Sequence, residues 1–309
     1  MQYLLLIICI IASAIQSPLK KIYQVKSKNG VFLFSAMISF VAALFFGTCA
    51  LASGTISFET NALLYALGFG ICYAITTVSG ILALGCGSLT LTSLIVSYSL
   101  IVPTIYGFFR SDNSIYLSQL IGIVFLLFSL YLSNYVKNTP KSTDDAKQNG
   151  SCNSRKGMKI SLKWIIYVVL TFTFNAGCVI VQQEQQLAFN GAYKNEFMFV
   201  ALMFVTIVLL GISFFYERKD FKTTLRFGTL SASLVGIFNG LNNLLVMIVA
   251  EKMIPVFIFF PIVSAGGLII SYILSITLFK ERFSTIQKVG ILLGMFALIF
   301  LNLEFVVLF

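Results

Sequence analysis

Ten long apolar runs divide the chain, and each can cross the hydrocarbon core of a membrane as a helix. They occupy residues 2–19, 30–53, 61–84, 89–109, 115–136, 162–189, 197–216, 227–250, 254–279 and 285–307. A crossing helix needs about 20 apolar residues, and lipid admits only helices or closed barrels because backbone groups find no water there. Barrel strands alternate polar and apolar residues over about ten positions, whereas these runs are continuous. We therefore expect an all-α integral membrane protein with ten transmembrane helices.

The composition agrees with this expectation and excludes several classes of function. Of the 309 residues, 58% are apolar and 10% are charged, with a mean hydropathy of +0.95, whereas a soluble domain carries far more charge. The sequence has no histidine, which excludes His-ligated metal sites and ordinary imidazole catalysis. Its six cysteines show no CxxC spacing, and five lie in or beside apolar runs, where cysteine usually acts as a small apolar residue. We expect no metal site and no cofactor.

The two halves of the chain repeat each other. Late in each half the shift is 168 residues, as in the pairs Gln119/Gln287, Gly122/Gly290 and Asn134/Asn302; earlier it is 166, as in Gln16/Gln182 and Gly70/Gly236. Five apolar runs precede the polar stretch 137–160 and five follow it, so we divide the chain into repeats at 1–136 and 161–309 joined by a flexible linker. Because the first repeat crosses the membrane an odd number of times, the second repeat enters the membrane from the opposite face. The sequence thus predicts two inverted five-helix repeats.

Basic residues are distributed unevenly between the connections. Connections after odd-numbered runs hold 18 of the 21 lysines and arginines, and the other face holds Arg110, Lys194 and Lys252. The positive-inside rule then makes the linker cytoplasmic and places both termini outside a cell membrane. The net charge of +10 is explained by this placement, so we expect lipid and a small solute as partners, and no nucleic acid. A monomer or a weak homodimer is the expected state.

The end of the ninth run and the start of the tenth resemble the end of an EamA repeat. The stretch Leu278-Phe279-Lys280-Glu281, followed by Gln287, Gly290 and Gly294, is similar to the LFGE and Q..G pattern of this family, the ten-helix branch of the drug/metabolite transporter superfamily. The first half carries a weaker version at Phe108-Phe109, Asp112, Gln119 and Gly122. Lys280 stands where the family usually has glycine. The resemblance implies secondary transport of small organic solutes, often export, and fixes no substrate.

Polar residues lie within several runs at positions that the repeat relates. Asn239, Asn242 and Asn243 share one helix face, and the shift of 166 maps them to Tyr73, Thr76 and Thr77. Tyr98 maps to Ser264, and Asn175 lies midway along the sixth run. Transporter sites lie near the midplane between repeats, so we interpret these nine residues as substrate-binding. The alternative is that they only hydrogen-bond one helix to another.

A second polar cluster, Gln182 to Gln186, lies near the end of the sixth run. Gln182 is the counterpart of Gln16, and we place Gln16, Gln182 and Glu184 at the cavity mouth or in ion coupling. A carboxylate in low dielectric takes up a proton more readily, which suits Glu184 for coupling. The alternative is a solvated helix end, because five consecutive polar residues cover every side of a helix.

The function that we expect is secondary transport of a small polar organic solute by alternating access, with export favoured by the resemblance. No P-loop occurs, so an ATP-driven pump is unsupported. The alternative is a membrane-embedded enzyme acting on a lipid, but HExxH and GxSxG motifs are missing, and we expect no enzyme. We expect Glu281 to pair with a neighbouring cation and help close the inner side. The Gly236/Gly240 pair predicts close helix packing.

Overall fold

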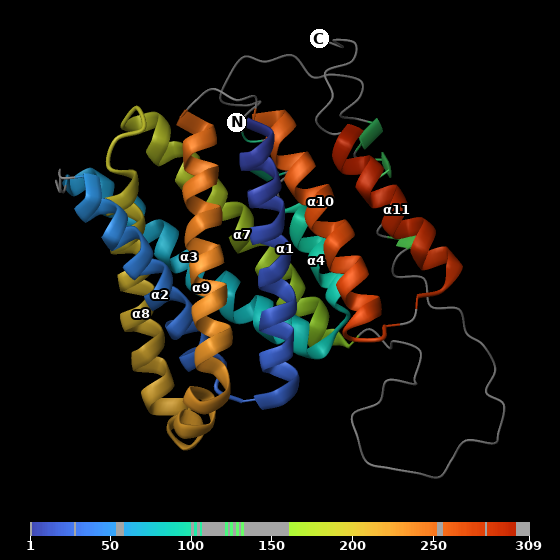
Figure 1. Ribbon diagram of the computed structural model, residues 1–309, viewed down its shortest axis with the longest axis horizontal. Helices are drawn as coiled ribbons and strands as arrows, with labels where there is room; N and C mark the ends of the chain where they lie inside the picture. The colour runs from blue at the N-terminus through green and yellow to red at the C-terminus, as the bar shows by residue number, and fades with distance from the viewer. Residues whose placement is uncertain are drawn as a thin grey trace.

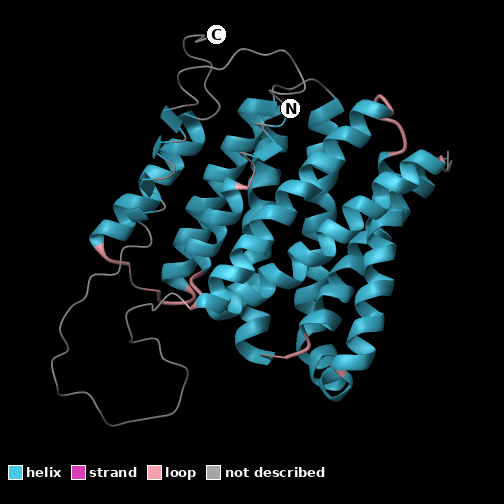
Figure 2. Ribbon diagram, turned by 180° about the vertical axis from the view of Figure 1, so that it is seen from behind, coloured by secondary structure: helices cyan, strands magenta, loops and turns pink. Residues whose placement is uncertain are grey.

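The computed structural model describes residues 2–27, 29–53, 59–99, 161–251, 256–281 and 283–300, together with residues 102–103, 106, 121–122, 124–125, 128–129 and 131–132. Every regular element in these residues is helical: α1 (Gln2–Ser27), α2 (Val31–Ser53), α3 (Thr60–Cys86), α4 (Leu89–Tyr98), α7 (Leu162–Ala188), α8 (Lys194–Tyr216), the 3₁₀ turn η1 (Arg218–Asp220), α9 (Phe221–Glu251), α10 (Val256–Thr277) and α11 (Thr285–Phe300). Figure 1 shows them side by side in one bundle, and the view from behind in Figure 2 agrees.

Each predicted run except the fifth overlaps one of these helices. Most of residues 115–136 and all of the linker 137–160 lie outside the described residues. Among the described residues, five segments are long and apolar enough to cross a membrane by length and composition: Val31–Ser53, Thr60–Cys86, Leu162–Ala188, Lys194–Tyr216 and Arg218–Ile248. Large apolar side chains such as Leu51, Phe215, Tyr216 and Leu230 are exposed on the bundle surface, which suits contact with lipid.

The first helix continues beyond its predicted end. We expected the run to stop at residue 19 because Lys20 and Lys21 follow, but α1 continues to Ser27. Hydropathy marks where the chain leaves lipid, whereas the helix ends only where the backbone changes conformation. Gly30 provides that change, with φ of +77°, a conformation that L side chains rarely adopt. A Cβ atom there would also lie 1.9 Å from the Thr224 hydroxyl oxygen, so the α1–α2 turn fits closely against α9.

Helix packing follows the repeat in the sequence. The shift of 166 relates α1 to α7, α2 to α8, α3 to α9 and α4 to α10. The helix α3 lies along α7, and the related helix α9 lies along α1. Likewise α2 packs on α9 while α8 packs on α3, and the related partners α2 and α8 also pack on each other. Every one of these contacts therefore has its counterpart in the other half.

Contacts at the helix ends give the directions of α1, α3, α7 and α9. Tyr65 near the start of α3 contacts Phe189 just after α7, so α3 and α7 are antiparallel. Tyr23 near the end of α1 bonds to Thr224 near the start of α9, so this pair is antiparallel too. Lys21 of α1 donates to the Gly87 carbonyl just after α3, so α1 and α3 run the same way. It follows that α1 runs opposite to α7, and α3 opposite to α9.

The other two related pairs also run in opposite directions. The backbone N–H of Leu33, at the start of α2, bonds to Glu217 just after α8. Ser88, immediately before α4, bonds to Glu281 just after α10. We call the side of the bundle with these contacts the Glu281 face; it holds the ends of α1, α3, α8 and α10, and it is the lower side in Figure 1.

Small residues bring α9 close to α2. A Cβ atom on Gly236 would lie 2.7 Å from the Val41 Cβ and 2.8 Å from the Ile38 carbonyl oxygen. Gly240, one turn later, lies against Phe45 in the same way. The close packing predicted for this glycine pair is therefore present. It fixes the position of α9, which carries Asn239, Asn242 and Asn243, against α2.

Candidate functional site

A buried chain of three polar side chains joins α3, α9 and α1. The Tyr73 hydroxyl donates to the Asn239 side-chain oxygen at 2.9 Å, and the Asn239 amide donates to the Gln16 side-chain oxygen at 3.2 Å. All three residues are buried, with 7%, 8% and 7% of their surface exposed. Buried amides and hydroxyls need partners, and these three residues satisfy one another across the interface between the two halves.

Two more asparagines extend this group along α9. Asn243 donates to the Asn239 side-chain oxygen at 3.1 Å and to the Asn239 carbonyl at 2.9 Å. The Asn242 side-chain oxygen accepts instead from the Ser13 hydroxyl at 2.8 Å and the Cys9 thiol at 3.1 Å. Asn239 and Asn243 thus share one centre, while Asn242 turns toward α1. We use the name central cluster for Gln16, Tyr73, Asn239 and Asn243.

The remaining predicted substrate-binding residues lie around this cluster. Thr77 is buried one turn beyond Tyr73, and Thr76 beside it is half-buried. Asn175 of α7 donates to the Ser99 hydroxyl at 2.7 Å. Tyr98 bonds to Ser129 at 2.9 Å, so it belongs to a separate contact at the end of α4. Ser264 lies in α10, but its side chain is outside the described part of the structure.

The glutamine cluster of α7 is largely inside the bundle. Gln182, Gln185 and Gln186 are 4%, 0% and 6% exposed, and α7 continues to Ala188. The alternative of a solvated helix end is therefore wrong for these three residues. Glu184 is half-buried and lies about 200° around the helix from Gln182. The carboxylate thus points away from the helix face that carries Gln182 and Gln186.

Gln186 contacts α9, and Gln182 lies one turn before it on the same side of α7. The Gln186 amide nitrogen lies 3.6 Å from the Met247 sulfur and donates to Gln185. Because α7 and α9 run in the same direction, Gln182, one turn before Gln186, lies level with Asn243, one turn before Met247. Within the described part of the chain, the buried Gln182 side-chain nitrogen and the Gln186 side-chain oxygen have no hydrogen-bond partner.

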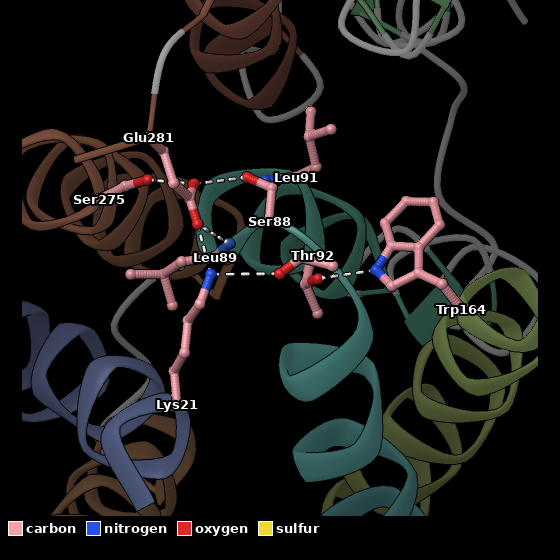
Figure 3. A network of polar contacts seen from close by, with 9 residues as sticks. Lys21, Ser88, Leu89, Leu91, Thr92, Trp164, Ser275 and Glu281 are labelled. Carbon is pink, nitrogen blue, oxygen red and sulfur yellow. Dashed lines mark hydrogen bonds and ion pairs between the residues drawn. The ribbon is translucent and has the colours of Figure 1, made fainter. Parts of the chain in front are cut away.

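A charged network joins the two halves at the Glu281 face (Figure 3). Glu281 forms an ion pair with Lys21, and the two side chains are only 12% and 9% exposed. The carboxylate also accepts from the Leu89 backbone at 3.0 Å, from Ser88 at 2.7 Å and from Ser275. The connection after α10 is thereby fastened to α1 and to the first turn of α4.

The electrostatics of Glu281 favour its charged form. Burial alone raises the pKa of this carboxyl, but the Lys21 ammonium and hydrogen bonds from Lys21, Ser275 and Leu89 outweigh burial and hold the pKa below its ordinary value. Glu217 plays a similar part after α8, where it accepts from the backbone N–H groups of Phe32 and Leu33 at 3.1 and 2.9 Å. Each acid from the second half caps a helix of the first half.

The sequence predicted a cation beside Glu281 but did not identify it as Lys21, which we used only to predict the orientation in the membrane. It also missed Glu217 as a cap. Ser88 carried a readable signal, since a serine just before an apolar run is a typical N-cap. Nothing in a single sequence indicates that residues 21 and 281 meet, because 260 positions separate them.

The fold and the polar interior define an all-helical, multi-pass membrane protein. The EamA-like transporter family matches residues 162–303, which confirms the resemblance predicted from the repeat endings. None of the curated proteins matches the chain significantly. A solved structure titled "Crystal structure of protein" is similar in fold, with a TM-score of 0.64 and 10% identity, covering 96% of this chain and 95% of the other. That likeness extends the fold over both halves.

Proposed function

We propose that this protein is a secondary transporter in the cell membrane, moving a small polar organic solute by alternating access. The path lies between two inverted five-helix repeats, residues 1–136 and 161–309, joined by the linker 137–160. Supporting this division, four helices of the first half run opposite to their counterparts in the second half. The family match favours transport over the alternative of a membrane-embedded enzyme.

The contact between Tyr73 and Asn239 carries the proposal. It joins equivalent positions of the two repeats, deep in the bundle, through buried polar groups. Polar side chains inside a membrane bundle usually mark a solute pathway, and transporter sites form at repeat interfaces. The substrate-binding set that we propose is Tyr73, Thr76, Thr77, Tyr98, Asn175, Asn239, Asn242, Asn243 and Ser264, with Gln16 and Gln182 beside it.

The network around Glu281 supplies the closed side of an alternating-access cycle. Its ion pair and hydrogen bonds hold α1, α4 and α10 together at one face. Lys21 and the basic connections containing Arg218 and Lys280 share this face, so we assign it to the cytoplasm by the positive-inside rule. We therefore assign this arrangement to the state that is closed toward the cytoplasm, and export would proceed by release on the other side.

Solute counterflow tests the proposal. Proteoliposomes are loaded with mixed unlabelled nucleobases, amides, amino acids, amines and sugars, and each labelled solute is then added outside. A transporter accumulates at least one label transiently without ATP. Asn239→Ala should abolish this accumulation, whereas Asn29→Ala, an exposed position in the α1–α2 turn, should keep it. Loss of accumulation in both variants, or none in the unaltered protein, contradicts the proposal.

A further inference from the structure

Two buried amide side chains on one face of α7 each have one polar atom without a partner in the described residues. The Gln182 side-chain nitrogen is a donor and the Gln186 side-chain oxygen is an acceptor, and neither finds a hydrogen bond in the described residues. Both side chains are more than nine-tenths buried. A buried unpaired amide is costly, and chains usually avoid it, so a complementary group from a ligand would stabilise this part of the bundle.

The two groups are one helical turn apart on the side of α7 that contacts α9 at Met247. Residues four apart on a helix lie on one side, with a rise of about 6 Å between them. Gln182 lies level with Asn243, whose amide is bonded to Asn239. A ligand that reaches both atoms must therefore carry an acceptor and a donor a few ångströms apart.

Every side chain of the central cluster is uncharged. Gln16, Tyr73, Asn239 and Asn243 offer only amide and hydroxyl groups. Glu184 points to the other side of α7, and the charges of Lys21 and Glu281 are already paired with each other at the Glu281 face. A charged solute that lost its water here would meet no opposite charge, and such a transfer is strongly unfavourable.

We propose that Gln182 and Gln186, together with the central cluster, bind an uncharged solute that presents a carbonyl acceptor beside an N–H donor. Carboxamides and nucleobases share this chemistry. A carbonyl oxygen of the solute accepts from the Gln182 nitrogen, and its N–H group donates to the Gln186 oxygen. The proposal rests on the proposed transport function and narrows its substrate class.

Thermal-shift titration of the purified protein tests the inference with four probes of similar size. Uracil and nicotinamide are uncharged, while glutamate and choline carry charges. We expect at least one uncharged probe to raise the melting temperature with saturation, and neither charged probe to do so. Gln182→Leu and Gln186→Leu should each weaken that binding about tenfold, because each removes one hydrogen bond in a buried site. Gln183→Leu, on a different face of the same helix, should bind as the unaltered protein does.

Three results would overturn the inference: saturable stabilisation by glutamate or choline, no stabilisation by either uncharged probe, or binding that stays within twofold in both leucine variants. If the leucine variants do not fold, Gln182→Met and Gln186→Met keep the side-chain length and serve instead. Counterflow separates the two proposals. If only a charged solute is exchanged, the transport function is supported and this inference is wrong. If uracil or nicotinamide binds but no solute is exchanged, the binding site is supported and the transport function is wrong.

Discussion

Tyr73 donates a hydrogen bond of 2.9 Å to Asn239, and the two residues occupy the same position in the two halves of the chain, 166 residues apart. Equivalent positions of two repeats touch each other only beside the axis that relates the repeats. This hydrogen bond therefore lies at the pseudo-twofold axis of the four related helix pairs. In the proposed transport mechanism, a solute bound there would contact both repeats at once, as a rocking movement about a central site requires.

Removing the Tyr73 hydroxyl should weaken transport more than folding. Tyr73→Phe keeps the ring in its apolar surroundings with Phe69 but removes one donor from the Asn239 oxygen, a loss of about 1 kcal/mol in stability. We expect counterflow to fall several-fold. Tyr65→Phe, on the same helix but in ring contact with Phe189, is the matched control. Equal rates in the two variants would contradict a role for the hydroxyl.

The Lys21–Glu281 ion pair should hold the bundle closed at the Glu281 face, and we call this ion pair the latch. Lys21→Met leaves the buried Glu281 carboxylate without its cation, which typically costs about 3–5 kcal/mol. The bundle should then open more readily toward that face. The single tryptophan, Trp164, lies nearby and donates to Thr92 at 3.1 Å, so its emission should shift to the red as water enters.

The double variant Lys21→Met/Glu281→Gln checks that the latch works through the pair. Removing both charges should cost less than the sum of the two single changes, because no unpaired charge remains. Additive effects on Trp164 emission and on unfolding would show that the two residues act separately, and the latch assignment would then be withdrawn.

Acid should release the same latch. The pKa of Glu281 is held below its ordinary value. The charged carboxylate therefore contributes fully to the free energy of unfolding above the ordinary carboxyl pKa of about 4.3. This contribution is lost as the pH falls through the lowered pKa of Glu281. Emission from Trp164 should therefore titrate below about pH 4 in the unaltered protein. Glu281→Gln should remove this transition, and a transition that persists in the variant must arise from another group.

How far the sequence predicted this structure depends on what each residue contacts. The continuous apolar runs predicted α2, α3 and α8 closely, because lipid demands both length and helix. The register of the repeat predicted that Tyr73 and Asn239 are equivalent, but it did not predict that they touch, since contact depends on where the axis falls. The Lys21–Glu281 pair could not be predicted from the sequence, because it forms only where α1, α4 and α10 pack together. The end of α1 was missed because hydropathy does not report backbone conformation.

Orientation stays a prediction from the basic residues, and Cys152 in the linker allows a direct measurement. With 18 of 21 basic residues assigned to one side, a membrane-impermeant thiol reagent should leave Cys152 unmodified in intact cells and modify it after permeabilisation. Replacing the other five cysteines by alanine or serine isolates the signal. Rapid labelling of Cys152 in intact cells would reverse the topology, and the Glu281 face would then be external.

Coupling to protons is tested at Glu184, the carboxylate near the end of α7. It lies within two residues of Gln182 but on another side of the helix. Glu184→Gln keeps the side-chain shape and removes the titration. If Glu184 couples transport, proton-driven accumulation should vanish while solute exchange persists, because exchange needs no net proton movement. Glu59→Gln, at an exposed acid before α3, should change neither accumulation nor exchange.

Undiminished accumulation by Glu184→Gln would exclude this residue as the coupling group. If the unaltered protein only equilibrates the solute across the membrane and does not accumulate it, the protein is a facilitator.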